Sequence, residues 1–124
     1  MTDVVVTVPM DRWDEWITEG DLPGDAWSGM ESHFNLAGPR PFVQPGERIY
    51  IVSRGKLRGY APLVRIDQGR IWGPGAHDPI GFALVRHGGA VAVTIPEAIR
   101  GFRGWRYRFW DYADERPFPN WRNA

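Results

Sequence analysis

The chain contains no cysteine, a single lysine and no long apolar run, and these absences exclude several classes of protein. Without cysteine there is no disulfide framework, no thiolate metal site and no cysteine nucleophile. No stretch approaches the roughly 20 apolar residues that a membrane helix needs, so we expect no membrane contact. The first residues, MTDVVVTVP, lack the basic start and long apolar segment of a signal peptide. We therefore expect a cytoplasmic protein.

Glycine and proline, in contrast, are abundant. Fifteen glycines and eleven prolines are too many for a helical bundle and favour a turn-rich β architecture. An apolar fraction of 43% with seven tryptophans is typical of a packed globule rather than of a disordered chain. A length of 124 residues predicts one domain, residues 1–124.

The net charge is zero, but the charges are unevenly distributed. Residues 1–45 carry eight acids and two arginines, residues 46–85 six bases and three acids, and residues 86–124 seven bases and four acids. Such asymmetry is compatible with a face for an anionic partner. Arginine outnumbers lysine fourteen to one, which a GC-rich coding genome also produces, so only the placement of the arginines carries information.

Alternating and β-branched stretches predict seven or so short strands. We expect them at residues 3–8, 48–53, 59–66, 70–72, 82–86, 90–95 and 105–112, with a turn at 67–69. In the last strand, alternation places Trp105, Tyr107 and Phe109 inside. Arg106 and Arg108 then form a basic stripe on the outer face.

The segment PMDRWDEWITEG, residues 9–20, predicts an amphipathic helix with a core-facing stripe that includes Met10, Trp13 and Trp16. The segment PEAIRGF adds one late helical turn that begins at Pro96. Between residues 21 and 45 we expect an irregular, aromatic loop that folds over one mouth of the domain. Together these elements predict an α+β fold, a small mixed β-barrel with one N-terminal helix and a short late helical turn.

The order of strand, helix, long loop and then PGERIYIVSRGKLRGYAPLVRI resembles the PUA-like superfamily, and within it the ASCH-type domains. In that group a Pro-Gly-acid-Arg/Lys-aliphatic stretch enters the central strand. The next strand carries a Gly-x-Ala-like pattern, matched here by Gly59, Tyr60 and Ala61. The similarity covers roughly residues 3–66 and extends by strand order toward Tyr112.

This resemblance implies a pseudobarrel with a cleft between the first helix, the long loop and the strands that follow. It also implies binding of RNA or of modified nucleobases, and some ASCH proteins are described as nucleases. Catalytic interpretations of ASCH domains rely on Lys and Tyr, whereas this chain has only Lys56, which argues against nuclease activity.

The turn between the two central strands concentrates three cations in five residues: Arg54, Lys56 and Arg58. Cationic donors beside a glycine that permits close approach, here Gly55, are suited to phosphate. A solvated hairpin tip, with no ligand, is the equally weighted alternative.

Aromatic and polar side chains in the loops are the candidates for contact with a base. Trp27 lies in the long loop, off any periodic face, and Trp72 lies at a strand end beside GPGAHDP. Asn35, His77 and Asp78 are candidates to select a base edge. Packing in the core is the alternative for both tryptophans.

The three histidines do not predict a metal site, because no two are at the spacing that a helix or tight loop needs. GPG and HGG lack the strand–loop–helix context of a phosphate-binding loop, so we expect no cofactor.

These features support three hypotheses. The first is a non-enzymatic module that binds nucleic acid, either RNA or DNA, or a modified base. The second is a small protein-interaction module of a virus or phage-like mobile element that acts on a host factor. The third is a weak ribonuclease that uses His77 or Tyr60.

Overall fold

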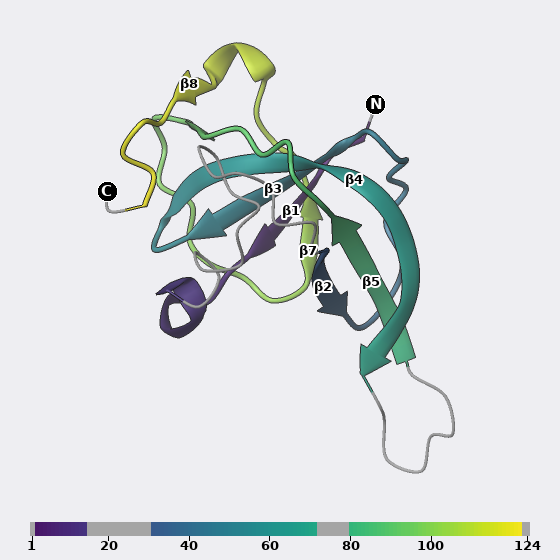
Figure 1. Cartoon of the computed structure of the whole chain (residues 1–124). Helices are drawn as coiled ribbons and strands as arrows, with labels where there is room; N and C mark the ends of the chain where they lie inside the picture. The colour runs from purple at the N-terminus through teal and green to yellow at the C-terminus, as the bar shows by residue number, and fades with distance from the viewer. Residues whose placement is uncertain (1, 15–30, 72–79, 123–124) are drawn as a thin grey trace.

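The computed structural model describes residues 2–14, 31–71 and 80–122, and in them a six-stranded sheet curls into a half-barrel (Figure 1). The strands of this sheet, in spatial order, are β2 (Ser32–Leu36), β5 (Ile80–Arg86), β4 (Lys56–Ile71), β3 (Arg48–Ser53), β1 (Val4–Thr7) and β7 (Trp105–Tyr107). β6 (Val93–Thr94) and β8 (Arg116–Pro117) form a small second sheet. A small, barrel-like β fold is thus confirmed.

The two central pairings follow from the sequence. β1 is the β-branched run VVVT, and it pairs in parallel with β3 and antiparallel with β7. β3 and β4 form the expected hairpin, and its tip residues Arg54 and Gly55 have φ angles of 53° and 77°. Positive φ at both central residues is the signature of a type I′ turn, which matches the twist of the flanking strands.

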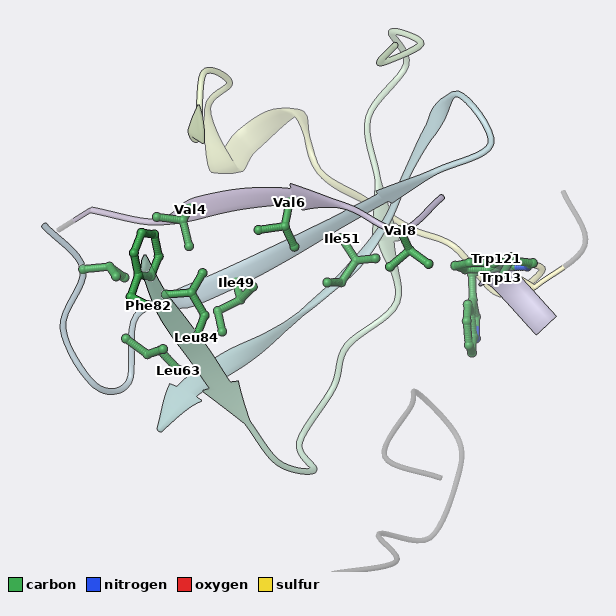
Figure 2. Close-up of a cluster of buried hydrophobic side chains, with 11 residues drawn as sticks. Val4, Val6, Val8, Trp13, Ile49, Ile51, Leu63, Phe82, Leu84 and Trp121 are labelled. Carbon is green, nitrogen blue, oxygen red and sulfur yellow. The ribbon is translucent and has the colours of Figure 1, made fainter. Parts of the chain in front are cut away.

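The sheet packs a hydrophobic cluster on each face because side chains alternate along its strands. Val4, Val6, Ile49 and Ile51 belong to the first cluster, which Figure 2 shows, whereas Val5 belongs to the second with other residues of β3 and the C-terminal segment. Trp13, expected in the core, is buried and meets the Trp121 ring edge-on, with centroids 5.8 Å apart. The half-barrel is therefore apolar inside and also covered on its outer face.

Several predicted elements differ from the observed ones. The turn at residues 67–69 is wrong, because Asp67 and Gln68 stay paired with β5 and β4 continues to Ile71, with an irregularity in the pairing after Gln68. The irregular loop at 21–45 was also wrong where β2 lies, since Ser32–Leu36 pairs with the whole of Phe82–Arg86.

The N-terminal helix is tested only in part. The described part of segment 9–20 shows the 3₁₀ turn η1 (Met10–Arg12) followed by helical backbone at Trp13 and Asp14, and residues 15–20, with Trp16, lie outside the described ranges. The late turn is not at Pro96, where the chain is irregular, but at η2 (Tyr112–Asp114). In the described residues no helical segment has the length and apolar character needed to cross a membrane.

Candidate functional site

The curled sheet has two edges, β2 and β7, and a pocket of about 460 Å³ is lined by β2 and by the chain just before β7. We call the line along which these two edges face each other the seam, and the pocket the seam pocket. The described lining residues come from β1 and η1, from β2, and from the chain just before β7: Val6, Thr7, Val8, Pro9, Arg12, His33, Phe34, Asn35, Leu36, Phe102, Arg103 and Gly104. The volume lies in the range of small-ligand sites, about 300–1,000 Å³.

Backbone contacts fix the walls of the seam pocket. The Phe102 amide donates to the Thr7 hydroxyl at 3.2 Å, which holds the segment before β7 against the end of β1. The Val8 amide donates to the Val52 carbonyl at 2.9 Å and so continues the β1–β3 ladder by one residue. These contacts hold the end of β1 and the segment before β7 in place around the pocket.

The pocket combines an apolar floor with polar walls. Val6 and Val8 belong to the core cluster, and Phe34 packs against it. His33 is half-buried, whereas Asn35, Arg12 and Arg103 are exposed. None of the described lining residues is acidic. Such a site suits a planar, partly apolar ligand that carries a hydrogen-bonding edge and a negative group.

Asn35 is the predicted site residue that lines this pocket. Arg12, His33, Phe102 and Arg103 were not predicted. A signal for β2 was present, since the polar His33 and Asn35 alternate with the apolar Phe34 and Leu36.

The hairpin tip adjoins the same end of the molecule. Its Gly55 carbonyl accepts from the Ile99 amide at 2.9 Å, three residues before Phe102 of the pocket. Arg54 and Lys56 are exposed at the tip, as expected. Two cations are thus available to a ligand there.

Arg58 is not at the surface of the tip, contrary to the prediction, because its side chain is only 2% exposed. Its Nε donates to the Ser53 carbonyl at 2.9 Å and its Nη1 to the Trp121 carbonyl at 2.8 Å. The guanidinium also lies over the Trp13 ring at 5.3 Å. Burial, with a smaller effect of Arg54, lowers the pKa of Arg58. The cause is the alternation of side chains along β4. Leu57 belongs to the second cluster, on the outer face of the sheet, so the next residue, Arg58, faces the interior of the half-barrel.

The other predicted site residues, Trp27, Trp72 and His77, lie outside the described residues, as does Asp78. Tyr60 is half-buried, with its ring 4.1 Å from the Arg48 guanidinium and 5.3 Å from the Tyr50 ring. Tyr60 lies outside the seam pocket's described lining.

The predicted alternation in segment 105–112 holds only within β7. Trp105 and Tyr107 share the face of Val4 and Val6, but Tyr107 is 39% exposed because β7 is an edge strand. Phe109 was expected inside and is 58% exposed, since the strand ends at Tyr107.

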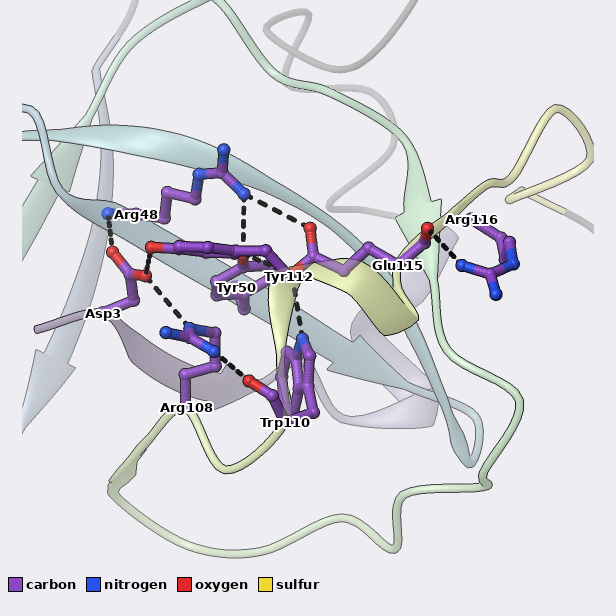
Figure 3. A network of polar contacts seen from close by, with 8 residues as sticks. All are labelled: Asp3, Arg48, Tyr50, Arg108, Trp110, Tyr112, Glu115 and Arg116. Carbon is purple, nitrogen blue, oxygen red and sulfur yellow. Dashed lines mark hydrogen bonds and ion pairs between the residues drawn. The ribbon is translucent and has the colours of Figure 1, made fainter.

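Arg106 is exposed, whereas Arg108 turns inward, so the predicted basic stripe is wrong at Arg108. The Arg108 Nε donates to the buried Asp3 carboxylate at 3.2 Å, and the Tyr112 hydroxyl donates to the same oxygen (Figure 3). That hydrogen bond, followed by burial, raises the pKa of Tyr112.

A second group of contacts in Figure 3 centres on Glu115, which accepts from the Tyr50 hydroxyl at 2.6 Å and from Trp110 Nε1 at 2.9 Å. These contacts attach the C-terminal segment to the sheet.

Within the described ranges, no three His, Asp or Glu residues lie close enough together to hold a metal ion. Comparisons with family models, with curated proteins and with solved structures found no match to this chain.

Proposed function

We propose that the chain is a non-enzymatic module that binds nucleic acid or a modified nucleobase, as its resemblance to PUA-like and ASCH-type domains implies. The observation that carries this proposal is the seam pocket, which is lined by Asn35 and two exposed arginines and adjoins a basic hairpin tip.

The pocket supplies the groups that a base requires. Phe34 and Phe102 are the aromatic residues of the described lining. The Arg106 guanidinium lies over the Phe102 ring at 4.4 Å, and stacking of a base on an aromatic face contributes about 1–3 kcal/mol. The Asn35 amide has donors and an acceptor side by side, an arrangement that recognises the edge of a base through paired hydrogen bonds. His33 is a second polar group on the same strand.

The surroundings supply cations for the phosphates. The Ile99–Gly55 hydrogen bond joins segment 97–103 to the tip, and Arg12 of segment 9–14 lines the pocket together with Arg103. The segments 9–14, 54–56 and 97–103 carry five bases: Arg12, Arg54, Lys56, Arg100 and Arg103. They carry three acids, Asp11, Asp14 and Glu97. Phosphate contacts of this kind position a strand without reading its sequence, and the pocket then selects the base.

Fluorescence anisotropy with labelled single-stranded RNA, single-stranded DNA and duplex DNA, at low and physiological salt, tests the proposal. We expect binding that weakens with salt, with a log–log slope of roughly −0.7 per phosphate contact on single strands. Asn35→Ala and Arg103→Ala should each weaken it. Arg116→Ala, which removes an exposed arginine of β8, is the matched control and should not.

Absence of binding to every probe at low salt would contradict the proposal. Equal weakening by Arg103→Ala and Arg116→Ala would also contradict it, because attraction would then come from overall charge and not from the pocket.

A further inference from the structure

Phe42 is the most exposed of the large apolar side chains described, at 83%. Its neighbours Pro41 and Val43 are both buried, so the backbone on each side is anchored in the fold. The side chain of Phe42 therefore projects into solvent from an anchored backbone. A contact residue on anchored backbone loses less conformational freedom on binding than one on a mobile segment, which favours its use as a contact.

The backbone at Phe42 lies against β7, at the seam. The Phe42 amide donates to the Tyr107 hydroxyl at 3.0 Å, and Trp105 Nε1 donates to the Pro39 carbonyl at 2.9 Å. The Trp105 and Tyr107 rings meet edge-on with centroids 4.8 Å apart. These contacts join the chain after β2 to β7, directly beyond the seam pocket.

Positions along the two edges run in the same order. Leu36 lines the seam pocket on one side and Gly104 lines it on the other. Farther along both sides, the Phe42 amide donates to the Tyr107 hydroxyl. Three residues of strand from Gly104 to Tyr107 span ~10 Å. Stacked bases along one strand are about 3.4 Å apart, so that distance corresponds to at most about three nucleotides, and to fewer when the strand is extended.

The charge of the seam identifies the kind of occupant. Residues 32–45 and 98–110, which form its two sides, contain five arginines and no acid: Arg40, Arg100, Arg103, Arg106 and Arg108. Of these, Arg108 is paired with Asp3, and the other four are exposed. A row of exposed arginines beside an exposed aromatic ring suits a polyanion with aromatic bases.

We propose that the ligand is single-stranded nucleic acid, with one base in the seam pocket and a second base, up to about three nucleotides along, stacked on Phe42. This inference rests on the proposed function and specifies its ligand. A duplex does not fit this role, because its bases are already paired and stacked.

The test compares a free mononucleotide with six-nucleotide RNA and DNA strands of mixed sequence, by calorimetry and anisotropy, on Phe42→Ala. We expect this variant to bind the six-nucleotide strand on the order of tenfold more weakly, and the mononucleotide as wild type does. Phe109→Ala is the control, since Phe109 is also exposed but packs on Trp110 of the outer cluster. It should change neither affinity.

The two proposals fail in different ways. If Phe42→Ala binds the six-nucleotide strands as tightly as wild type does, the second stacking position is wrong and the pocket remains. If the wild-type protein binds none of the probes, the proposed function fails and this inference fails with it.

Discussion

At the scale of single residues, environment decides what each arginine does. Arg54 is exposed at a turn, while Arg58, four residues away, is buried among aromatic rings and backbone carbonyls. Both belong to one basic stretch of sequence, and composition alone cannot separate them. The alternation that begins at the buried Leu57 does separate them, and it is the better guide.

Arg54 gives the first prediction at this scale. It occupies the left-handed region, φ 53°, where asparagine is tolerated and Asn-Gly is the favoured type I′ pair. Arg54→Asn should therefore raise the free energy of unfolding, by up to about 1 kcal/mol. It should also weaken nucleic-acid binding. Urea unfolding and anisotropy measure the two effects, and weaker binding by a more stable protein cannot be attributed to misfolding.

Arg54→Lys is the matched control, because it keeps the cation at the tip. It should retain most of the binding. If Arg54→Asn binds as wild type does, the tip contributes no phosphate contact.

Glu31 gives the second prediction at the scale of single residues. Hydrogen bonds from Arg65, at 2.6 and 2.7 Å, are the largest cause that lowers the pKa of Glu31 from 4.5 to about 2. The folded value lies below the unfolded one, so this ion pair stabilises the fold above about pH 4.5, and its contribution is lost as the pH falls toward 2. Carboxyl NMR should give a Glu31 pKa near 2, which Arg65→Gln returns toward 4.5. An unchanged value in Arg65→Gln would show that Arg65 is not the cause.

At the scale of elements, the sequence was informative where the pattern was local. β1 and the β3–β4 hairpin were predicted because β-branched runs and a glycine turn identify them. β2 was missed although its side chains alternate, because the alternation covers only five residues and the pairing partner, β5, lies some 50 residues away. The turn proposed at 67–69 was wrong for a related reason: long-range pairing with β5 outweighs the local preference of Gly69.

Gly59 shows how one position joins two elements. Its φ is +150°, and a Cβ there would lie 2.5 Å from the Val91 carbonyl oxygen, which accepts from the Tyr60 amide. Gly59→Ala should lower the free energy of unfolding by about 3 kcal/mol, because either the backbone shifts or this bridge breaks. Gly46→Ala also has a positive φ, but no atom lies near the added Cβ. It should cost about 1 kcal/mol in the same urea unfolding. Equal losses of unfolding free energy in Gly59→Ala and Gly46→Ala would contradict the predicted clash with the Val91 carbonyl.

Tyr50 attaches the C-terminal segment to β3. Its buried hydroxyl donates to Glu115, and both burial and this hydrogen bond raise its pKa. Tyr50→Phe should cost about 1.5–3 kcal/mol, the typical contribution of a hydrogen bond to a charged group. Tyr107→Phe, which removes a more exposed hydroxyl, is the control and should cost less.

The raised pKa of Tyr50 also predicts a pH dependence. Unfolded tyrosine ionises near pH 10, whereas the folded side chain stays neutral, so the stabilisation is complete below pH 10 and declines as the pH rises beyond it. Tyr50→Phe should lack this component of the decline. Parallel stability curves for the two proteins above pH 10 would contradict it.

At the scale of the whole molecule, a curled sheet brings together segments that are distant in sequence. The seam pocket combines the end of β1, the strand β2 and the segment before β7, which span residues 6 to 104. Asn35 could be proposed from its residue type alone, but its neighbours Arg12, Phe102 and Arg103 required the closure of the half-barrel. The barrel-like class was predictable from composition and strand pattern, and the site was not, because it depends on which edges meet.

The most direct test of the account is to map a ligand onto this seam by NMR. A single-stranded oligonucleotide titrated into ¹⁵N-labelled protein should shift the amide signals of residues 33–36, 42 and 102–104, and those of the tip at 54–56. The amide signals of the small second sheet, β6 and β8, should stay unchanged. Shifts confined to other surfaces, or no shifts at low salt, would contradict the proposal that the seam binds nucleic acid.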